Sequence, residues 1–531
     1  MGQGGDSHNA GAGDPILTLA VEQDTVPWYK KRNLRYLYLM LIPTCMGIEI
    51  TSGWDSGMIN AVQIVPAWKT YFGHPAGALQ GILAAMYSLG AICSLPIVPI
   101  VNDKLGRRWA IFIGSWIMIF GAILQGASNG VGMYLAARWF LGFGIPMCIV
   151  AASSLLGELG YPKERPILTS LFNASYFVGA ILAAGITFGT QKISGDWSWR
   201  IPSLLQMAPS LFQVSLIFLI PESPRFLISK DRHEEARAIL IKYHAEGDAS
   251  SPLVNAEIAQ IETTIKLELE ASKRSWLDML RTPGMRKRVL IAGLLGLFTQ
   301  WSGNTLISYY LDKILTTIGI TDSSVKGKIN IGRSCWDLVN GVTLALVVKR
   351  FRRRTMYLVC TCSLLVVYVG WTITQQQFLV TQKAALGNLV LFWIFLYSPC
   401  YNTGYNALTY TFLVELFPFA QRARGIAIFQ FFGRGAGFFN TFVNPIGLDN
   451  IGWKYLITYC CWIAFEICVV YFLFPETSGR TLEELAFLFE DHALADKATA
   501  ATDKQLHGGS ITMNEIADKN EAVQVENKQV A

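Results

Sequence analysis

Charge is scarce in this 531-residue chain, since only 15% of its residues are Asp, Glu, Lys or Arg. An average soluble domain has about 25%. Outside its apolar segments the sequence also lacks a nucleophile elbow, a metal-ligand cluster and a phosphate-binding glycine loop. These absences argue against an enzyme, and we expect neither a metal ion nor another cofactor.

The positions of the histidines and cysteines argue against a proton relay or a zinc site within the membrane. All six histidines lie outside the apolar segments, which argues against a histidine proton relay within a membrane; they are His8, His74, His233, His244, His492 and His507. The ten cysteines fall almost entirely inside those segments, without a CxxC pair and histidines at zinc spacing. We interpret the cysteines as buried thiols.

What the chain has in abundance is apolar blocks of about 20 residues, the length that crosses the roughly 30 Å hydrocarbon core of a bilayer. Their number predicts an all-α membrane protein with twelve transmembrane helices. The predicted spans lie near residues 36–58, 77–101, 109–127, 131–155, 168–190, 203–220, 289–311, 328–348, 355–374, 387–413, 425–447 and 454–474.

Basic residues gather in alternate loops between these spans. Lys104, Arg107 and Arg108 follow the second span and residues 349–354 (KRFRRR) follow the eighth, whereas the intervening loops carry few. The positive-inside rule places the basic loops, and with them both termini, in the cytoplasm. The net charge of +6 then reflects topology, so the expected large partner is a lipid bilayer and not a nucleic acid.

The two halves of the chain repeat one another. Trp199 is followed by Trp453 and the motif PESPR at 221–225 by PETSGR at 475–480, both 254 positions later. Glu158 and Glu415 are 257 positions apart. Such duplication predicts two pseudo-symmetric six-helix halves with a substrate site between them. The predicted parts are a disordered N-terminus (1–34), the two halves (35–220 and 289–474), a cytoplasmic helical linker (221–288) and a cytoplasmic tail (475–531).

Taken together, several motifs resemble the sugar porter family of the major facilitator superfamily. They are DKLGRR (103–108), ARWFLGFG (137–144), WSWRIPSLLQ (197–206), PESPRFL (221–227), QWSGNTLISYY (300–310), VELFPFAQRARG (414–425) and PETSGRTLEE (475–484). The stretches SGWDSGMIN (52–60) and 439–455 look most similar to the fungal lactose and cellodextrin permease group. The resemblance implies a carrier that works by alternating access and, by family default, as a monomer.

Sugars have many hydroxyls, so their sites need amides that donate and accept and aromatic faces for stacking. The candidate substrate-binding residues are Gln206, Gln300, Trp301, Asn304, Tyr309 and Tyr310, followed by Asn340 and Asn440. By spacing, Gln300 and Asn304 share one helical face, and by resemblance this is the sugar-binding face of the second half. The alternative is that such amides only join helices.

Two positions depart from the family pattern. Trp301 replaces a frequent glutamine, and Arg434 in FFGRGAG (431–437) places a cation where many members have an Asn-Trp pair. Because charges within membranes normally pair, we expect Glu466 or Asp337 to neutralise Arg434, unless Asp337 pairs with Arg333 instead. An unpaired Arg434 would favour an anionic substrate such as a sugar acid or a quinate-like acid.

Asp55 is an acidic residue within the first predicted span, where an ionised carboxylate costs about 3 kcal/mol even on lenient scales. By resemblance, proton-coupled members carry Asp in this motif, passive carriers carry Asn, and the partner is Arg138. Protonation would break the pair and shift the balance between two helix arrangements. A permanent structural ion pair is the alternative, and Glu49 is a second carboxylate that could take the role.

Charges near the cytoplasmic ends of the spans resemble the family's inner gate. The predicted gate residues are Asp103, Arg107, Arg108, Glu158, Glu222, Arg225, Glu415 and Arg422, with residues 352–354 facing the last two. By resemblance, their ion pairs close the inner side and part when the carrier opens inward. In the second half Lys349 and Arg352 occupy the usual Asp and Gly positions, which leaves surplus positive charge.

The predicted function is secondary active transport of sugar with protons across a fungal plasma membrane. Lactose, cellobiose or another di- or oligosaccharide, or a hexose, is the expected substrate. A passive sugar facilitator, a carrier of an anionic sugar-like acid and a non-transporting sugar sensor are the alternatives, and the direction of transport stays open.

Overall fold

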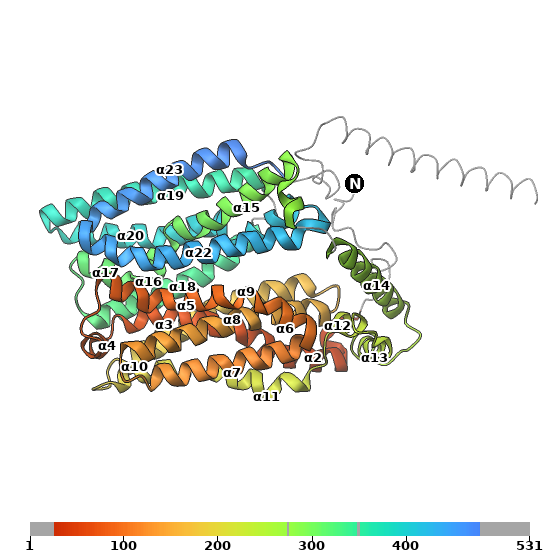
Figure 1. Ribbon diagram of the computed structural model, residues 1–531. Coiled ribbons are helices and arrows are strands. Elements are labelled where there is room, and N and C mark those ends of the chain that lie inside the picture. Colours follow the sequence, from red (N-terminus) through yellow and green to blue (C-terminus); the bar gives the residue numbers. More distant parts are fainter. Residues whose placement is uncertain (1–25, 273–275, 348–350, 478–531) are drawn as a thin grey trace, which may run out of the picture.

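The computed structural model describes residues 26–272, 276–347 and 351–477, and every regular element within them is a helix (Figure 1). The predicted N-terminal segment and cytoplasmic tail lie largely outside the described residues. The predicted all-α membrane class is confirmed at this level.

The helices of the first part follow in close succession. They are η1 (Trp28–Lys30), α2 (Arg32–Leu41), the π-helix η2 (Ile42–Met46), α3 (Gly47–Val62), α4 (Pro66–Tyr71), α5 (Gly77–Ser94), α6 (Ile97–Leu105), α7 (Arg107–Gly126), α8 (Val131–Leu159), α9 (Arg165–Thr190), α10 (Trp197–Leu205), α11 (Ala208–Leu216) and η3 (Ile217–Leu219). Shorter helices come next: α12 (Pro224–Ile228), α13 (His233–His244), α14 (Pro252–Ser272) and η4 (Trp276–Leu280).

Long helices resume after this segment. They are α15 (Pro283–Trp301), α16 (Asn304–Tyr309), α17 (Leu311–Thr317), α18 (Ser323–Val347), α19 (Arg353–Thr381), α20 (Ala384–Tyr401), the π-helix η6 (Asn402–Asn406), α21 (Thr409–Leu416), α22 (Phe419–Ile451), η7 (Gly452–Lys454) and α23 (Tyr455–Leu473).

Within the described residues, eight segments are long and apolar enough to cross a membrane. They cover nine of the twelve predicted spans, because the segment Arg424–Leu473 contains both 425–447 and 454–474. The predicted spans 36–58, 289–311 and 328–348 are not among the eight. The first carries Glu49 and Asp55, the second breaks after Trp301, and the third carries Arg333 and Asp337.

Several long helices are interrupted where proline or glycine occurs. Pro96 separates α5 from α6, Pro43 lies within η2, and Pro399 precedes η6. Proline lacks the N–H that would continue the helical ladder, and π-helical turns of this kind are frequent at functional sites. The predicted spans 36–58, 77–101 and 387–413 are therefore each divided at these residues.

The buried apolar residues separate by sequence into two bundles. One core contains residues from Met279 to Phe474, and the others contain residues from Leu34 to Ala256 together with Tyr310. In Figure 1 the red and orange helices form one bundle and the green and blue helices the other. α5 packs along α22 and α9 along α18, so these four helices line the interface between the bundles.

Glycines allow the closest helix crossings within the first bundle. A Cβ at Gly142 of α8 would lie 1.9 Å from the carbonyl oxygen of Tyr87 on α5. A Cβ at Gly53 of α3 would lie 1.8 Å from the carbonyl oxygen of Tyr176 on α9. Small residues permit such close backbone contact between helices in membranes, and here they fix the positions of α3 and α8, which carry Asp55 and Arg138.

The helices α12 to α14 lie together at one end of the bundles, here called the linker end, and α4 and α17 lie at the opposite, distal end (Figure 1). A buried cluster attaches the linker helices. Arg165 Nη2 and His244 Nδ1 lie 3.0 Å and 2.6 Å from the two carboxylate oxygens of Glu257. His244 Nε2 is 3.2 Å from the carbonyl oxygen of Leu159, which joins α13 to the end of α8.

We expect this cluster to make the thermal stability of the protein depend on pH. Burial opposes ionisation of Glu257, but His244 and Arg165 outweigh it and hold the pKa of its carboxyl below the usual range. Because the folded-state pKa is lowered, the stabilisation is complete above about pH 5 and is lost as pH falls through the folded-state value. We expect the melting temperature of Glu257→Gln to lie below that of the wild type at pH 7 and to approach it at acidic pH. A constant difference across pH would contradict this assignment, and Glu234→Gln on the exposed face of α13 is the matched control.

Candidate functional site

An ion pair buried in the first bundle forms the centre of the candidate site. Asp55 of α3 and Arg138 of α8 are 2% and 0% exposed, and Arg138 Nη1 donates to Asp55 Oδ1. Gln206, which follows α10, donates to the same oxygen at 2.9 Å. The guanidinium of Arg138 also lies 5.2 Å from the ring centre of Tyr87. The structure thus brings together the two residues predicted for proton coupling, and their role in coupling stays a prediction.

The pair is only partly satisfied by hydrogen bonds. Asp55 Oδ2 and Arg138 Nε and Nη2 are buried without a hydrogen-bond partner. Buried charges normally use all their hydrogen-bonding capacity. One carboxylate oxygen of Asp55 therefore lacks a hydrogen-bond partner among the described residues.

Two of the predicted substrate residues, Gln300 and Asn304, keep side-chain hydrogen-bonding groups that other protein atoms do not occupy. Gln300, Asn304 and Tyr309 are all half-buried. In the described part of the chain, the side-chain amide of Gln300 forms no protein hydrogen bond, and that of Asn304 only accepts one from Ser308, at 3.2 Å. Tyr309 lies within electrostatic reach of Asp55, Arg138 and Arg434. Tyr309 therefore lies near the ion pair, and the amides of Gln300 and Asn304 remain able to bind a ligand.

The other predicted substrate residues make contacts that join helices. Gln206 supports Asp55, and Trp301 donates to the carbonyl oxygen of Ala436 at 3.0 Å. Tyr310 is fully buried and donates to the carbonyl oxygen of Thr441. Asn340 bonds Trp336, Ser398 and Asn402, and Asn440 bonds Gln300, Thr305 and Tyr459. These contacts favour the alternative that such side chains hold helices together.

The helix that carries these residues is broken where the sequence predicted one continuous face. α15 ends at Trp301 and α16 begins at Asn304, so the expectation that Gln300 and Asn304 share one helical face was wrong. Gly303 at the break has φ +95°, and a Cβ there would lie 1.6 Å from the Tyr368 hydroxyl oxygen. Only glycine fits this conformation and this space.

The expected neutralisation of Arg434 by Glu466 or Asp337 was also wrong. Asp337 pairs instead with Arg333 of its own helix at 3.4 Å, and Glu466 bonds the hydroxyls of Ser302 and Tyr405. Among the described residues no carboxylate lies within ion-pair distance of Arg434. Its electrostatic neighbours include Glu49 of α3, across the interface between the bundles. The sequence pointed to carboxylates in the same bundle as Arg434 and did not reveal Glu49, which lies in the other bundle.

At the linker end of the first bundle, the predicted gate charges form a cluster. Arg107 Nε lies 3.2 Å from Glu158 Oε2, and Glu222 accepts hydrogen bonds from the backbone N–H groups of Arg107 and Arg108 at 3.3 and 3.2 Å. Burial raises the pKa of the Glu222 carboxyl, and these N–H groups and that of Ser223 oppose the shift. Asp103 is exposed and outside this cluster, and Arg225 is half-buried on α12.

The second bundle repeats this arrangement. Arg353 Nη2 lies 3.3 Å from Glu415 Oε1. Glu476 accepts from the backbone N–H groups of Arg353 and Arg354 at 3.0 and 3.3 Å, as Glu222 does in the first bundle. Arg422 is half-buried on α22. We did not predict Glu476, although its motif repeats that of Glu222. The Arg107–Glu158 and Arg353–Glu415 pairs each join elements of one bundle.

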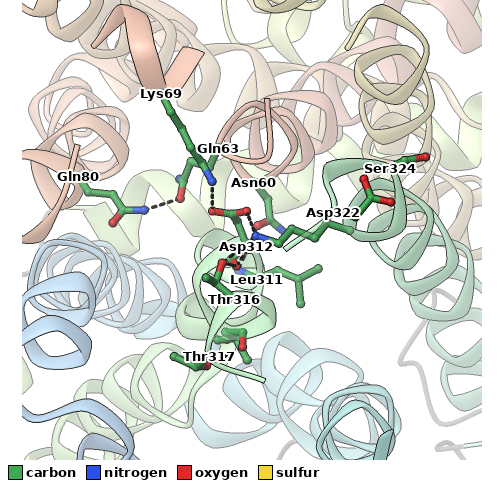
Figure 2. A network of polar contacts seen from close by, with 12 residues as sticks. Asn60, Gln63, Lys69, Gln80, Leu311, Asp312, Thr316, Thr317, Asp322 and Ser324 are labelled. Carbon is green, nitrogen blue, oxygen red and sulfur yellow. Dashed lines mark hydrogen bonds and ion pairs between the residues drawn. The ribbon is translucent and has the colours of Figure 1, made fainter. Parts of the chain in front are cut away.

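A polar network that the sequence did not predict joins the bundles at the distal end. Lys69 of α4 and Lys326 of α18 each lie 2.7 Å from a different carboxylate oxygen of Asp312 on α17. Asn60 of α3 accepts from the N–H of Leu311 at 3.2 Å and donates to Asn330 at 3.2 Å. Figure 2 shows Lys69 reaching Asp312 from the first bundle. The only sequence signal was a few charges in otherwise uncharged loops.

Further contacts extend this network along the interface. Gln80 of α5 donates to Gln63 at 2.8 Å, as Figure 2 also shows. Asp449 of α22 accepts from the N–H of Gly77 at 2.6 Å and forms an ion pair with Lys313. At the distal end the two bundles are therefore in direct contact, and the end is closed.

A two-bundle helical membrane protein with a buried ion pair and a closed distal end fits a carrier. The family model described as "Sugar (and other) transporter" matches residues 40–489. The hexose transporter HXT13 of Saccharomyces cerevisiae is 28% identical over 502 residues, covering 89% of this chain and 86% of the relative. The MFS-type transporter oryC of Aspergillus oryzae is 27% identical over 444 residues, covering 82% of each.

Solved structures show the same fold. The inward open conformation of the xylose transporter XylE from E. coli matches with a TM-score of 0.71 and 20% sequence identity, covering 86% of this chain and all of that one. The chain thus belongs to the sugar porter family of the major facilitator superfamily. It is a membrane transporter and not an enzyme.

Proposed function

We propose that this protein is a secondary active carrier that moves a neutral sugar together with a proton, with Asp55 as the proton acceptor. The observation that carries the proposal is the buried Asp55–Arg138 pair with Oδ2 of Asp55 unbonded. An ionised Asp55 attracts Arg138 and holds α3 to α8. Protonation removes that attraction, which changes the relative stability of two helix arrangements.

Alternating access needs two halves that move against each other. We propose that residues 35–220 and 289–474 form two six-helix halves with twelve spans in all, joined by residues 221–288. The separation of the buried cores and the repeated Glu222 and Glu476 contacts support this division. Basic loops at the linker end favour a cytoplasmic location for that end and for both termini.

In this topology the distal end faces outward and is closed. Lys69, Asp312 and Lys326 then form an outer gate, and the Arg107–Glu158 and Arg353–Glu415 pairs stabilise each half at the inner side. Opening to the outside requires separation of Lys69 from Asp312, which exposes both charges to water. We propose that sugar reaches Gln300, Asn304 and Tyr309 when the gate opens.

Several features favour a hexose or a sugar built from hexoses. Relatives are named as hexose and glucose transporters, and one solved relative is titled a proton:xylose symporter bound to 6-bromo-6-deoxy-D-glucose. The finer resemblance to lactose and cellodextrin permeases remains a prediction. We further propose a plasma-membrane location and a monomeric working unit.

The test is proton uptake on addition of sugar. Yeast lacking its own hexose and disaccharide carriers would express the protein in weakly buffered medium. Glucose, lactose, cellobiose or a sugar acid would then be added in separate runs. We expect the medium to become more alkaline with at least one neutral sugar, and labelled sugar to enter in parallel. Entry of labelled sugar without alkalinisation would indicate a passive facilitator, and sugar binding without entry would indicate a sensor.

An anionic substrate is the second candidate, and Arg434 favours it. This cation lies on α22 at the interface and is not neutralised by Asp337 or Glu466. A carboxylate ligand could pair with it directly. Uptake of the sugar acid, but of no neutral sugar, in the same experiment would establish this second function and exclude the first.

A further inference from the structure

A second buried carboxylate lies in the other bundle, far from Asp55 in sequence. Glu466 of α23 has no exposed surface. The hydroxyl of Ser302 lies 2.9 Å from each of its carboxylate oxygens, and the hydroxyl of Tyr405 in η6 lies 2.9 Å from Oε2. These contacts connect α23 to the end of α15 and to a π-helical turn.

Unlike Asp55, Glu466 has no cation beside it. The titratable groups within its electrostatic reach are Cys360, Tyr368, Tyr397, Tyr401 and Tyr405. Among the described residues, no Lys, Arg or His forms an ion pair with it. An isolated ionised carboxylate in such surroundings is costly, because no counter-ion is paired with it and its side chain is fully buried.

The number of hydroxyl protons around Glu466 also favours a protonated, neutral Glu466 carboxyl. Ser302 has one hydroxyl proton, but its oxygen is in hydrogen-bond contact with the carbonyl oxygen of Phe298 as well as with Glu466. A carbonyl can only accept, and serine within a helix commonly donates to the carbonyl four residues earlier. The contact between Ser302 and Glu466 then needs a proton from Glu466, while Tyr405 donates to Oε2.

We propose that Glu466 is a proton-binding site that carries a proton in this arrangement of the helices. The neutral carboxyl donates to Ser302 and accepts from Tyr405, so it ties the α15–α16 break to η6 and α23 without placing a net charge in the membrane. Tyr397 and Tyr401 complete this surrounding by donating to the carbonyl oxygens of Ser302 and Thr299 at 3.3 and 2.7 Å.

The site lies where proton binding would affect the substrate helix. Gly303 and Asn304 follow Ser302 directly, and α16 carries Asn304 and Tyr309. Loss of the proton would remove the bond to Ser302 and leave an ionised carboxylate beside the oxygen of that residue. The position of α16 therefore depends on a proton that is distinct from the one assigned to Asp55.

Infrared spectroscopy of the purified full-length protein tests the proposal directly. The wild type should show a C=O stretching band of a protonated carboxylic acid that shifts in D2O. The band should be absent in Glu466→Gln and retained in Asp55→Asn, the matched control in the other bundle. Absence of the band in the wild type, or its full retention in Glu466→Gln, would overturn the proposal.

Two further measurements keep the proposal testable if Glu466→Gln folds poorly. Ser302→Ala removes the acceptor, so the band should move to higher frequency, and an unmoved band would contradict the assigned bond. In addition, folding with a proton on Glu466 makes the melting temperature fall as pH rises. Tyr405→Phe should extend this fall to higher pH, because it removes a donor that favours the ionised carboxylate. A fall that ends at the same pH in Tyr405→Phe and in the wild type would count against the site. None of these readouts uses transport, so they are independent of the proposed sugar–proton coupling.

Discussion

Cells that express Asp55→Asn should exchange labelled sugar across the membrane but should no longer take up protons when sugar is added. Asparagine has the shape of aspartate and can still accept from Arg138 and Gln206, but it cannot gain or lose a proton at neutral pH. Proton coupling can raise the internal sugar concentration about tenfold for each pH unit of gradient, since one unit corresponds to about 1.4 kcal/mol. The variant should lose this whole factor and reach equal concentrations on both sides.

The measurements are medium alkalinisation and steady-state accumulation of a non-metabolised sugar. Glu49→Gln is the matched control because it removes a carboxylate from the same helix without disturbing Arg138. Continued proton uptake by Asp55→Asn, together with its loss in Glu49→Gln, would transfer the role to Glu49. Because Asp55→Asn leaves Arg138 buried without a counter-charge, the amount of folded protein must be compared in both variants, and Asp55→Asn/Arg138→Gln provides a charge-balanced version.

Asp312→Asn should be the most destabilising single change at the distal end. One carboxylate there holds two ammonium groups, and the side chain of Lys326 is only 4% exposed. Breaking a buried ion pair by removal of one partner typically costs about 3–5 kcal/mol, since the remaining charge stays buried. We expect a melting temperature several degrees lower and a shift of the carrier away from the state in which the distal end is closed.

Matched variants separate the two lysine contacts. Asp312→Asn/Lys326→Met should recover most of the lost stability, because no unpaired buried ammonium remains. Lys69→Met should cost less, since the side chain of Lys69 is 31% exposed and solvent already screens its charge. Asp322→Asn in the adjacent loop is the surface control. An unchanged melting temperature in Asp312→Asn would show that the network does not hold the distal end closed.

The motif repeat contained a signal for Glu476 that the predicted gate residues did not use. PESPR and PETSGR place Glu222 and Glu476 at equal positions of the two repeats, and each accepts from the first N–H groups of the helix after a basic loop. The surplus positive charge at Lys349 and Arg352 did not prevent this, because the bonds use backbone N–H groups and Arg353. That these charges close the inner side stays a prediction.

The sequence by itself determined the class of the protein and most of its helical segments, and its resemblance to a known family implied the pairing of Asp55 with Arg138. Hydropathy, duplication and motif order depend on residues close together in the chain or repeated at a fixed spacing, so they can be read without coordinates. Tertiary structure decided which polar side chains remain available and which join helices. It separated Gln300, Asn304 and Tyr309 from Tyr310, Asn340 and Asn440, although all are polar residues in apolar segments.

The same physical reason explains the residues that were missed. Lys69 and Asp312 come from different bundles, as do Glu49 and Arg434, while Glu466 meets Ser302 more than 160 positions away in the chain. No periodicity connects such partners, because their distance depends on how the bundles pack. The sequence specifies which charges are buried in the membrane, and only the packing of the helices specifies what stabilises each of them.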